Sequence, residues 1–302
     1  MTVPTVPLAI VSPVRDEAAY VRRILDSMVA QTVRPCEWLF VDDGSRDDTR
    51  AIIEAYAAHH PWIRVIRRAD RGRRQVGAGV IAAFDEGRAQ LQSRDYRYLA
   101  KLDGDLSIPP RYLEIMLARL AAEPDLAAVS GKVFRPEGGR EVEEFMIDEQ
   151  VAGQFKLYKR EAFEAIGGFT QTPLWDGIDM HRCRLHGWRT LSFHHPQARI
   201  YHHRLMGSSE KSIYEGRKRL GRALWFVGYH PLYALASGVF RMAEKPRVIG
   251  GLLMLYAYTR AALTRQPQFE DVALRRELRR WQLERLRRLP GFLRRQFGRA
   301  QR

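Results

Sequence analysis

The sequence has very little cysteine, with only Cys36 and Cys183 among its 302 residues. Two isolated cysteines cannot build a disulfide framework, and neither belongs to a C-x-x-C pair of the kind that holds zinc or performs redox chemistry. The chain also does not open with a basic stretch followed by a long apolar run, so no secretory signal is visible. We therefore expect a reducing, cytoplasmic setting.

Uninterrupted apolar runs of about 20 residues, the length of a membrane-spanning helix, are also missing. The two most apolar segments are 223–243, which His230-Pro231 interrupts, and 248–264, which Arg260 interrupts. No internal repeat or low-complexity linker separates the parts of the chain. With 45% hydrophobic and 28% charged residues, the composition is that of a globular protein of one large or two modest domains.

Acidic residues are scarce relative to basic ones. The 50 lysines and arginines outnumber 35 acidic residues, which gives a formal net charge of +15. Such a charge favours acidic partners, whether nucleic acid, anionic lipid or phosphorylated substrates. Residues 265–302 hold twelve arginines, no lysine and four acidic residues, so this tail alone contributes +8. The excess charge is thus concentrated at the C-terminal end.

Apolar runs of strand length alternate with segments of helical spacing through the first hundred residues. The pattern predicts strands at 7–14, 37–42, 63–66 and 96–102, and helices at 17–31, 49–58 and 75–91. This alternation predicts βαβ units and an α/β fold with a mostly parallel sheet. Ligands of such sheets bind at the carboxyl ends of the strands, where the polar clusters of this sequence lie.

The later part of the chain is more mixed. Strands are predicted near 127–133, 189–193 and 198–202, and helices near 159–166 and 177–186. Beyond residue 208 the pattern indicates helices without clear strands, the last of them rich in arginine. The sequence therefore predicts an α/β domain followed by a helical extension.

Two acidic clusters follow predicted buried strands. Asp42 and Asp43, ahead of a Gly-Ser turn, can accept hydrogen bonds from a nucleotide base or from ribose hydroxyls. The alternative is an Asp-Gly turn in which the aspartate caps the next helix. Asp103 and Asp105 stand two residues apart, so both side chains point the same way. They can reach one Mg²⁺ or Mn²⁺, an ion that commonly combines one or two carboxylates with substrate phosphates.

Two further clusters lie in the second half of the predicted α/β domain. Asp176 opens a predicted helix, where it can cap the helix or act as a general base beside a substrate hydroxyl. Asp179 lies one turn further on and can share that face. His202 and His203 end a predicted strand, where they can complete a metal site or face solvent.

Taken in order along the chain, these motifs resemble the family 2 glycosyltransferases, which share the GT-A fold. Residues 41–49 read VDDGSRDDT and match the signature V-D-D-G-S-x-D-x-T, and residues 103–105 match the D-x-D motif. Residues 27–32 read SMVAQT and match S-x-x-x-Q-T. The stretch from Gly153 to the Gly-Gly-Phe at 167–169 resembles the acceptor-side region. The resemblance covers about residues 5–215, with Arg15-Asp16-Glu17 standing where Tyr-Asn-Glu is common.

The resemblance implies a role for each matching residue. Pro13, Glu17 and Asp43 would line the nucleotide pocket, and Arg71 or Arg74 can contact the diphosphate or can belong to a solvated basic loop. Asp103 and Asp105 would hold the ribose and the divalent metal, with His202 completing the metal site and His203 as the alternative ligand. The residues implied to bind nucleotide and metal are therefore Pro13, Glu17, Asp43, Arg71, Arg74, Asp103, Asp105 and His202.

The family's catalytic base usually follows a glutamate. In this sequence Trp175 stands in that place, so the resemblance implies Asp176 as the base and leaves Asp179 as the alternative. The implied reaction is an inverting, Mn²⁺- or Mg²⁺-dependent sugar transfer. A nucleotide diphosphate-sugar, UDP-sugar by family resemblance, would be the donor, and a glycan or lipid-linked acceptor in bacterial polysaccharide or glycoconjugate synthesis would supply the hydroxyl.

We expect a GT-A domain at 1–215, with a donor half at about 1–106 and an acceptor half at about 107–215. A basic helical extension at 216–302 would follow. Its apolar segments and arginines indicate contact with an anionic membrane at the cytoplasmic face of the inner membrane. The alternative for the extension is a set of ordinary helices packed on the domain. The alternative functions of the protein are an inactive transferase-like membrane scaffold, a nucleotidyltransferase and a nucleic-acid-binding protein. No nucleic-acid motif is present, and nucleic acid is not an expected partner.

Overall fold

The structure is a computed structural model that describes residues 3–69, 77–172, 174–204 and 212–299, with side chains up to residue 288. Contacts divide the chain into two compact units, Met1–Leu205 and Met206–Arg302. The sequence prediction places its domain boundary ten residues later.

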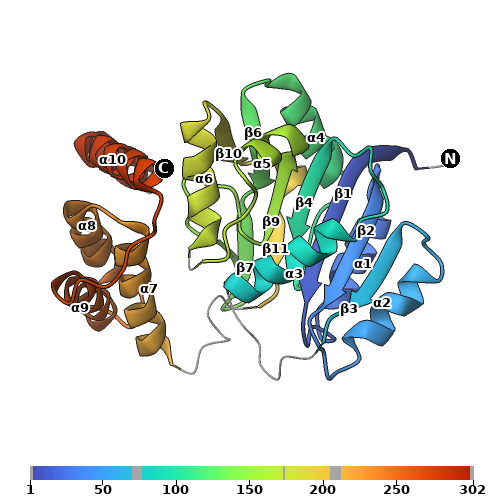
Figure 1. The fold of residues 1–302 in the computed structure, drawn as a ribbon, viewed down its shortest axis with the longest axis horizontal. Coiled ribbons are helices and arrows are strands. Elements are labelled where there is room, and N and C mark those ends of the chain that lie inside the picture. Colours follow the sequence, from blue (N-terminus) through green and yellow to red (C-terminus); the bar gives the residue numbers. More distant parts are fainter. Residues whose placement is uncertain (1–2, 70–76, 173, 205–211, 300–302) are drawn as a thin grey trace. The chain divides into compact units, whose positions relative to one another are not determined.

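A seven-stranded sheet forms the centre of the first unit (Figure 1). Its strands, in spatial order, are β10 (Arg189–Phe193), β6 (Leu126–Gly131), β9 (Phe155–Lys159), β4 (Tyr98–Leu102), β1 (Thr5–Val14), β2 (Arg34–Asp42) and β3 (Ile63–Arg67). Neighbouring strands are parallel, except that β9 runs antiparallel to both β4 and β6. The predicted α/β fold with a mostly parallel sheet is confirmed.

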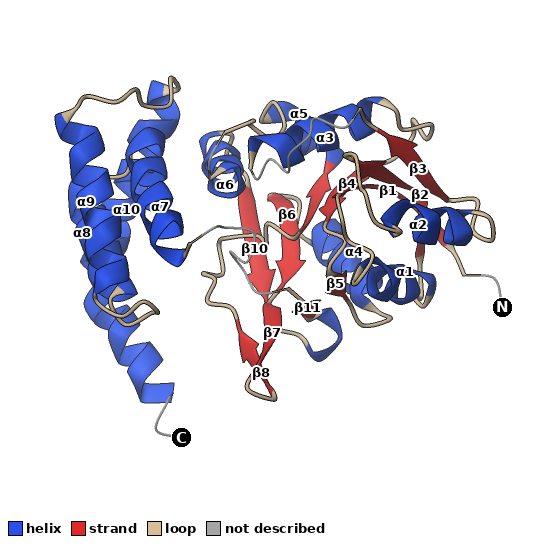
Figure 2. Cartoon of the chain, turned by 90° about the horizontal axis from the view of Figure 1, so that it is seen from below, coloured by secondary structure: helices blue, strands red, loops and turns tan. Residues whose placement is uncertain are grey.

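Helices cover both faces of this sheet (Figure 2). One face packs on α1 (Val21–Val29), α2 (Thr49–Ala57) and α4 (Tyr112–Ala122), and the other on α3 (Ala78–Ala89), α5 (Arg160–Ala165) and α6 (Trp175–Leu185). In β1 the alternation sends Leu8 and Ile10 into the first core and Ala9 and Val11 into the second. Burial on both faces explains why β1 reads as a continuous apolar run.

A smaller four-stranded sheet has the order β5 (Leu106–Ser107), β11 (Ile200–His202), β7 (Val133–Glu137) and β8 (Arg140–Glu143). Its β5 directly follows the D-x-D residues and pairs antiparallel with β11, so that Leu106 lies opposite His202. A 3₁₀ turn, Pro196–Ala198, leads into β11. This sheet therefore brings a strand from residue 200 to the end of β4.

The sequence prediction missed several elements of the first unit. The predicted strand at 127–133 is two strands, β6 and β7, which part at Lys132. Strand β9 was not predicted because Lys156, a charged residue, occupies one of its buried positions and interrupts the apolar run expected of a central strand. Helix α4 and the short strands β5 and β8 were also not predicted.

The second unit contains α7 (Ile213–Val227), α8 (Pro231–Arg241), α9 (Ile249–Leu263) and α10 (Val272–Arg299). The apolar segment 223–243 is divided between two helices, because Gly228 ends α7 with a positive φ of 89° and Pro231 begins α8. At Gly221 a Cβ atom would lie 2.1 Å from the carbonyl oxygen of Met254, so α7 and α9 pack closely there. Among the described residues, none of the helices combines the length and apolar character that a membrane crossing requires.

One glycine sets the position of the turn before β11. A Cβ atom at Gly131 would lie 1.5 Å from the carbonyl oxygen of Ala198, a contact with backbone that cannot be relieved by a side-chain rotation. We expect Gly131→Ala to destabilise the protein by about 1–3 kcal/mol or more, because overpacking moves the backbone. The denaturant midpoint of unfolding, followed by circular dichroism, measures this loss.

Gly177→Ala provides the matched control, since a Cβ atom on Gly177 in α6 meets no atom within 4 Å. Alanine is about 1 kcal/mol better than glycine inside a helix, so this variant should unfold at an equal or higher midpoint. An unchanged midpoint for Gly131→Ala would contradict the close approach of β6 to the Pro196–Ala198 turn.

Candidate active site

The carboxyl ends of β1, β2 and β4 meet at one edge of the large sheet. In the parallel ladders Val14 lies opposite Asp42, and Val11 lies opposite Lys101. The backbone N–H of Asp43 donates to the carbonyl oxygen of Val14 at 2.9 Å. The acidic clusters that follow β2 and β4 are therefore neighbours in the folded protein, as expected of a ligand-binding edge.

Asp43 and Pro13 are both expected to line a nucleotide pocket, and they lie at the carboxyl ends of adjacent strands, with Asp43 directly after β2. Pro13 is paired with Val41 in the β1–β2 ladder. The buried Asp43 carboxylate accepts a hydrogen bond from Arg68 at 2.9 Å, and its carbonyl oxygen accepts one from Arg15 at 2.8 Å. The carboxylate is thus held by a guanidinium that the sequence prediction did not identify.

Glu17 is buried beside the loop that connects β4 to β5. Its backbone N–H donates to Thr49 Oγ1 at 2.7 Å, which ties it to the start of α2. At Gly104, between the two aspartates of the D-x-D motif, a Cβ atom would lie 3.0 Å from Val14 and 3.5 Å from Glu17. The motif therefore packs directly against the residue expected to bind nucleotide.

Asp103 forms an ion pair with a buried lysine two residues before it. Lys101 Nζ lies 2.5 Å from Asp103 Oδ1 and donates to the carbonyl oxygen of Gly153 at 2.8 Å. The backbone N–H of Asp103 also donates to the carbonyl oxygen of Gln154 at 2.9 Å. Burial raises the pKa of Asp103 although the Lys101 ammonium opposes this shift. The end of β4 is therefore joined to the 153–154 segment.

The other aspartate of the motif faces His202. The β5–β11 pairing brings His202 Nε2 to 3.5 Å from Asp105 Oδ2, while Nδ1 lies 3.3 Å from Glu144 Oε1. Burial by itself lowers the pKa of His202, but the hydrogen bonds that the imidazole donates to the two carboxylates raise it to about 9. His202 and Arg204 likewise lower the pKa of Asp105 against the effect of burial. Two carboxylates therefore fix the orientation of the imidazole.

The neighbouring His203 faces a different set of atoms. Its Nδ1 accepts from Arg23 at 2.8 Å and its Nε2 lies 2.8 Å from Ser107 Oγ, so the Nε2–H tautomer satisfies both contacts. Burial and the Arg23 charge lower the pKa of His203. Because successive residues of a strand point to opposite faces, only one of the two histidines can face Asp105.

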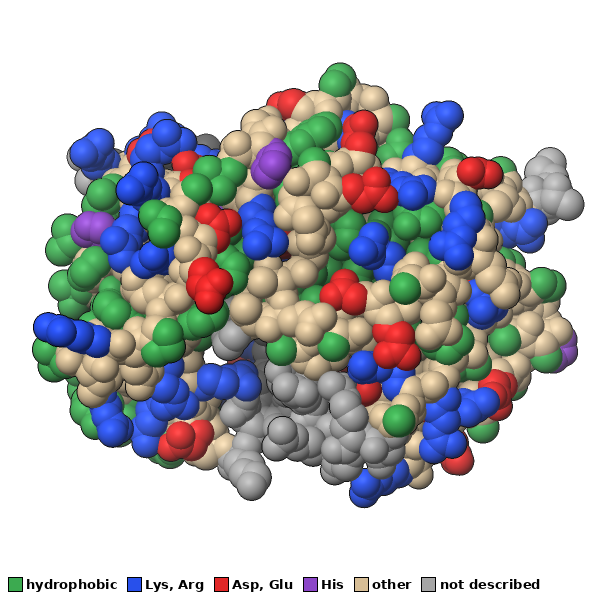
Figure 3. All heavy atoms as spheres, viewed as in Figure 1, with side chains coloured by type: hydrophobic (Ala, Val, Ile, Leu, Met, Phe, Trp, Pro, Cys, Tyr) green, Lys and Arg blue, Asp and Glu red, His purple; other side chains and the backbone are tan. Residues whose placement is uncertain are grey.

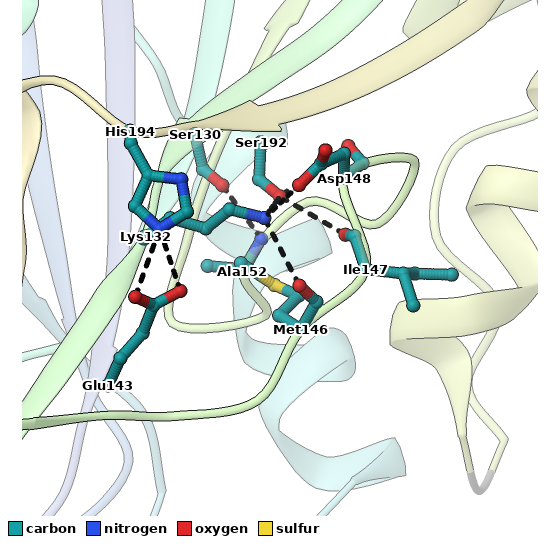
Figure 4. A network of polar contacts seen from close by, with 9 residues as sticks. All are labelled: Ser130, Lys132, Glu143, Met146, Ile147, Asp148, Ala152, Ser192 and His194. Carbon is teal, nitrogen blue, oxygen red and sulfur yellow. Dashed lines mark hydrogen bonds and ion pairs between the residues drawn. The ribbon is translucent and has the colours of Figure 1, made fainter. Parts of the chain in front are cut away.

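The segment that carries Glu144 is fixed from both ends (Figure 4). Lys132, which is buried, donates from Nζ to Asp148 at 2.7 Å and to Ser192 at 3.0 Å. The backbone N–H of Ala152 donates to Ser130 Oγ at 3.0 Å. These contacts, drawn as dashed lines in Figure 4, hold the segment that follows Glu144 against β10 and the end of β6.

Arg204 connects the expected nucleotide and metal residues. Its Nη2 atom donates to Glu17 Oε2, and its Nε atom lies 3.4 Å from Asp105 Oδ2. The guanidinium carbon also lies 5.1 Å from the centre of the Tyr20 ring. One cation therefore lies against both Glu17 and the second aspartate of the D-x-D motif.

The metal that the resemblance implies can be compared with these donors. Among the described side chains, no three aspartates, glutamates, histidines or cysteines form a ready ligand group. Asp105 and His202 are adjacent, whereas Asp103 is paired with Lys101. One carboxylate and one imidazole fit Mg²⁺ or Mn²⁺, since such ions complete their shell with water and substrate phosphates. The bond from His202 Nδ1 to Glu144 is the outer contact that metal-binding histidines usually make.

Asp176, at the start of α6, lies against the 153 segment. A Cβ atom at Gly153 would lie 3.2 Å from Asp176 Oδ2. The carbonyl oxygen of Gly153 accepts from Lys101, the partner of Asp103, so a short series of contacts links Asp176 to the D-x-D motif. Asp176 is half-buried, whereas Asp179 is buried.

Asp179 has a different environment from Asp176. The carboxylate is buried, pairs with Lys156 and accepts a hydrogen bond from Tyr158 at 2.6 Å. Burial raises the pKa of Asp179 against the opposing effects of Lys156 and Tyr158. Lys156 also donates to the backbone carbonyl of Asp176 at 2.8 Å. Asp179 therefore holds the lysine that positions the start of α6.

Trp175 stands where the family usually has a glutamate, and its ring contacts two buried lysines. The ammonium of Lys101 is 5.2 Å from the ring centre and that of Lys156 is 5.1 Å away. An aromatic ring attracts cations through its negatively charged face. The tryptophan ring therefore adds a cation–π contact to each of the two lysines, which also pair with Asp103 and Asp179.

Two sequence-predicted residues, Arg71 and Arg74, lie outside the described residues. The structure adds five residues that the sequence prediction missed, namely Arg68, Lys101, Glu144, Lys156 and Arg204. Lys101 and Arg204 stand two residues from a predicted site residue, and this spacing is a usable signal for a shared face. Glu144 and Lys156 carry no such signal, because their partners come from distant parts of the chain.

Loss of the Asp179 carboxylate would leave Lys156 as a buried, unpaired charge. We expect Asp179→Asn to destabilise the protein by about 3–5 kcal/mol, the usual effect of breaking a buried ion pair. Thermal unfolding followed by circular dichroism measures this loss. Glu164→Gln is the control, since its pair with Arg160 is solvent-exposed and worth at most about 1 kcal/mol. Equal melting temperatures for both variants would refute a structural role of Asp179.

Comparisons with known proteins bear on this geometry. The model of the family described as "Glycosyl transferase family 2" matches residues 9–173. The chain is 30% identical over 129 residues to a chondroitin synthase from Escherichia coli, which covers 42% of this chain and 17% of that protein. The chain thus spans only a sixth of the length of this relative.

Two solved structures are similar in fold to this chain. A mannosyltransferase from Pyrobaculum calidifontis, solved with GDP-mannose and Mn²⁺, matches with a TM-score of 0.53 and 16% identity, over 89% of this chain and 78% of that one. S. aureus TarS 1–349, solved with UDP-GlcNAc, matches with a TM-score of 0.54 and 16% identity, over 85% and 72%.

The family match covers more than half of the chain and extends from β1 to the residues before α6. The arrangement of the seven-stranded sheet agrees with the fold that the sequence motifs predict. This protein therefore belongs to glycosyl transferase family 2 and has the GT-A fold.

Proposed function

We propose that the protein transfers a sugar from a nucleotide diphosphate-sugar, most simply a UDP-sugar, to a hydroxyl of a glycan or lipid-linked acceptor. Family membership and the GT-A fold support a transferase of this class. The observation that carries the proposal is the arrangement of Asp105 and His202, oriented by Glu144, beside the donor edge of the sheet. Bacterial polysaccharide or glycoconjugate synthesis is the proposed setting.

The donor would bind along the carboxyl edge of β1, β2 and β4. Pro13 and Asp43 are proposed to line the base pocket, and Glu17 to support it from below the D-x-D loop. Asp103 would accept a hydrogen bond from the ribose, with Lys101 holding its carboxylate in place. Arginines match phosphate geometry, so Arg204 and the arginines at positions 71 and 74 are proposed to contact the diphosphate.

Asp105 and His202 are the proposed ligands of Mn²⁺ or Mg²⁺, with Asp103 close to them. A bound divalent ion would neutralise the charge that develops on the leaving diphosphate. Glu144 fixes His202 so that Nε2 faces Asp105, which leaves this nitrogen as the ligand. Without donor or ion, Arg204 neutralises Asp105 and Glu17. The donor phosphates and the ion would bind beside this guanidinium.

Asp176 is the proposed general base. Its half-buried carboxylate lies beside Gly153 and would accept the proton of the acceptor hydroxyl as that oxygen attacks the anomeric carbon. Attack from the face opposite the leaving diphosphate inverts the anomeric configuration. Asp179 is proposed as a positioning residue, because it holds Lys156 and Lys156 holds the backbone of Asp176. On this proposal residues up to about 106 bind the donor and the following part binds the acceptor.

A metal-binding measurement tests the role of Glu144. Isothermal titration of Mn²⁺ into protein with UDP present should show an affinity about 10–100-fold lower for Glu144→Ala, because His202 loses its outer partner. Glu143→Ala is the matched control, since this neighbour pairs with His194 and should bind Mn²⁺ normally. Equal affinities for the two variants would remove Glu144 from the site. Glu144→Gln, which keeps an acceptor oxygen, should recover part of the affinity.

Transfer kinetics test the base. With Mn²⁺ and a nucleotide sugar that thermal-shift screening identifies as a ligand, Asp176→Asn should lower kcat by about 10²–10⁴-fold and leave donor affinity unchanged. Asp125→Asn, a change at an exposed ion pair, serves as the control and should keep full turnover. Near-normal turnover by Asp176→Asn would overturn the assignment. If no nucleotide or nucleotide sugar raises the melting temperature, the proposed donor class is wrong.

A further inference from the structure

The excess positive charge of the protein belongs almost entirely to the second unit. Met1–Leu205 contains 29 basic and 28 acidic residues, a net charge of +1, whereas Met206–Arg302 contains 21 basic and 7 acidic residues, a net charge of +14. A field of this size attracts anionic partners and repels a second copy of the same unit. The neutral first unit shows that the charge is not a general property of the chain.

Helix α8 exposes apolar side chains where a helix of a globular protein usually exposes polar ones. Its buried face consists of small residues, Ala234 and Gly238. The opposite face carries four large apolar side chains that are 52–57% exposed: Leu232, Leu235, Val239 and Phe240. Because these four recur at helical spacing, they form a continuous stripe along the helix.

Helix α9 repeats this arrangement. Met254 and Ala257 are buried, while Ile249, Leu252 and Tyr256 are 52–57% exposed, and Leu263 is 79% exposed. The exposed residues follow one another at intervals of three, four and seven, again along one side of the helix. A second apolar stripe therefore lies beside the first.

The two stripes share one side of the α8–α9 pair. At Gly238 a Cβ atom would meet the Leu255 side chain, so the helices pack face to face. Helix α9 also packs against α7, where Gly221 closely approaches Met254. Helix α8 packs against α10, where the Tyr233 ring contacts the Trp281 ring. Helical periodicity then directs the stripes of α8 and α9 away from α7 and α10. This surface, Leu232, Leu235, Val239, Ile249, Leu252 and Tyr256, is called the apolar stripe below.

Basic residues border the apolar stripe. The turn between α8 and α9 exposes Lys245 and Arg247 next to Val248 and Ile249, and α9 exposes Arg260. Figure 3 shows hydrophobic side chains mixed with lysine and arginine over the helices of this unit. Apolar side chains within a basic surface are the composition of helices that lie in a membrane interface.

We propose that the apolar stripe is a membrane-docking surface, and that its partner is a bilayer leaflet containing anionic lipids. The apolar side chains would enter the region between headgroups and acyl chains while Lys245, Arg247 and Arg260 contact lipid phosphates. Helix α9 has 15 residues and so is about 22 Å long, shorter than the ~30 Å apolar core of a bilayer, which suits a helix lying in the interface plane. The inference concerns the second unit alone and does not depend on the proposed transfer reaction.

Vesicle flotation of the full chain tests this surface. The parent protein should float with vesicles that contain 30% phosphatidylglycerol, float less at 0.5 M NaCl, and remain unbound to phosphatidylcholine vesicles. Leu235→Gln, Val239→Gln and Leu252→Gln combined should weaken binding more than about 10-fold, because three apolar side chains leave the interface. Lys245→Ala with Arg247→Ala should weaken it by about 10–30-fold, given about a factor of five for each basic residue.

Leu185→Gln is the matched control, since Leu185 lies in the first unit and is 43% exposed. It should bind vesicles as the parent does, and melting curves should show that every variant is folded. Equal vesicle binding by the triple variant and the parent would overturn the proposal. So would failure of the parent to bind anionic vesicles, or sedimentation showing that the parent forms a dimer which the triple variant loses, because the stripe would then be a contact between two copies.

Discussion

Buried charges at the carboxyl edge of the sheet require partners, and this requirement organises the first unit. A charge removed from water costs several kcal/mol unless an opposite charge and hydrogen bonds replace the solvent. Lys101 pairs with Asp103 in the loop after β4, and Lys156 pairs with Asp179 in α6. Arg204 pairs with Glu17. The Lys156–Asp179 and Arg204–Glu17 pairs join segments far apart in the sequence, and Lys101 does so through its hydrogen bond to the carbonyl oxygen of Gly153, so these contacts also hold the candidate site in one geometry.

The imidazole of His202 shows how such pairing leads to chemistry. Glu144 occupies one ring nitrogen and Asp105 faces the other, so the ring cannot rotate without losing a partner. A group fixed in this way is already oriented for a ligand, which lowers the cost of binding it.

The charges of the second unit follow a different pattern, since they lie on a helical surface with exposed apolar side chains and have a net excess of +14. One unit neutralises its charges internally, and the other presents them.

Much of the fold could be predicted because local patterns carry it. Strands β1, β2 and β3 and helices α1 and α2 follow from apolar periodicity, and their alternation predicts the parallel sheet. Strand β9 could not be predicted, since Lys156 interrupts its apolar pattern and is tolerated only because Asp179 and Trp175 surround it. The division of segment 223–243 into α7 and α8 has a local cause, Gly228 and Pro231, which the sequence shows directly.

The sequence by itself determined the family, the α/β alternation and the residue types of the candidate site, because motifs such as VDDGS and D-x-D are contiguous and report local chemistry. The tertiary structure alone decided which of those residues meet. It placed His202 rather than His203 against Asp105, enclosed Asp179 and left Asp176 half-buried, and added Glu144. The physical reason is that burial and pairing depend on segments 21 or more residues apart, whose contacts no local pattern records.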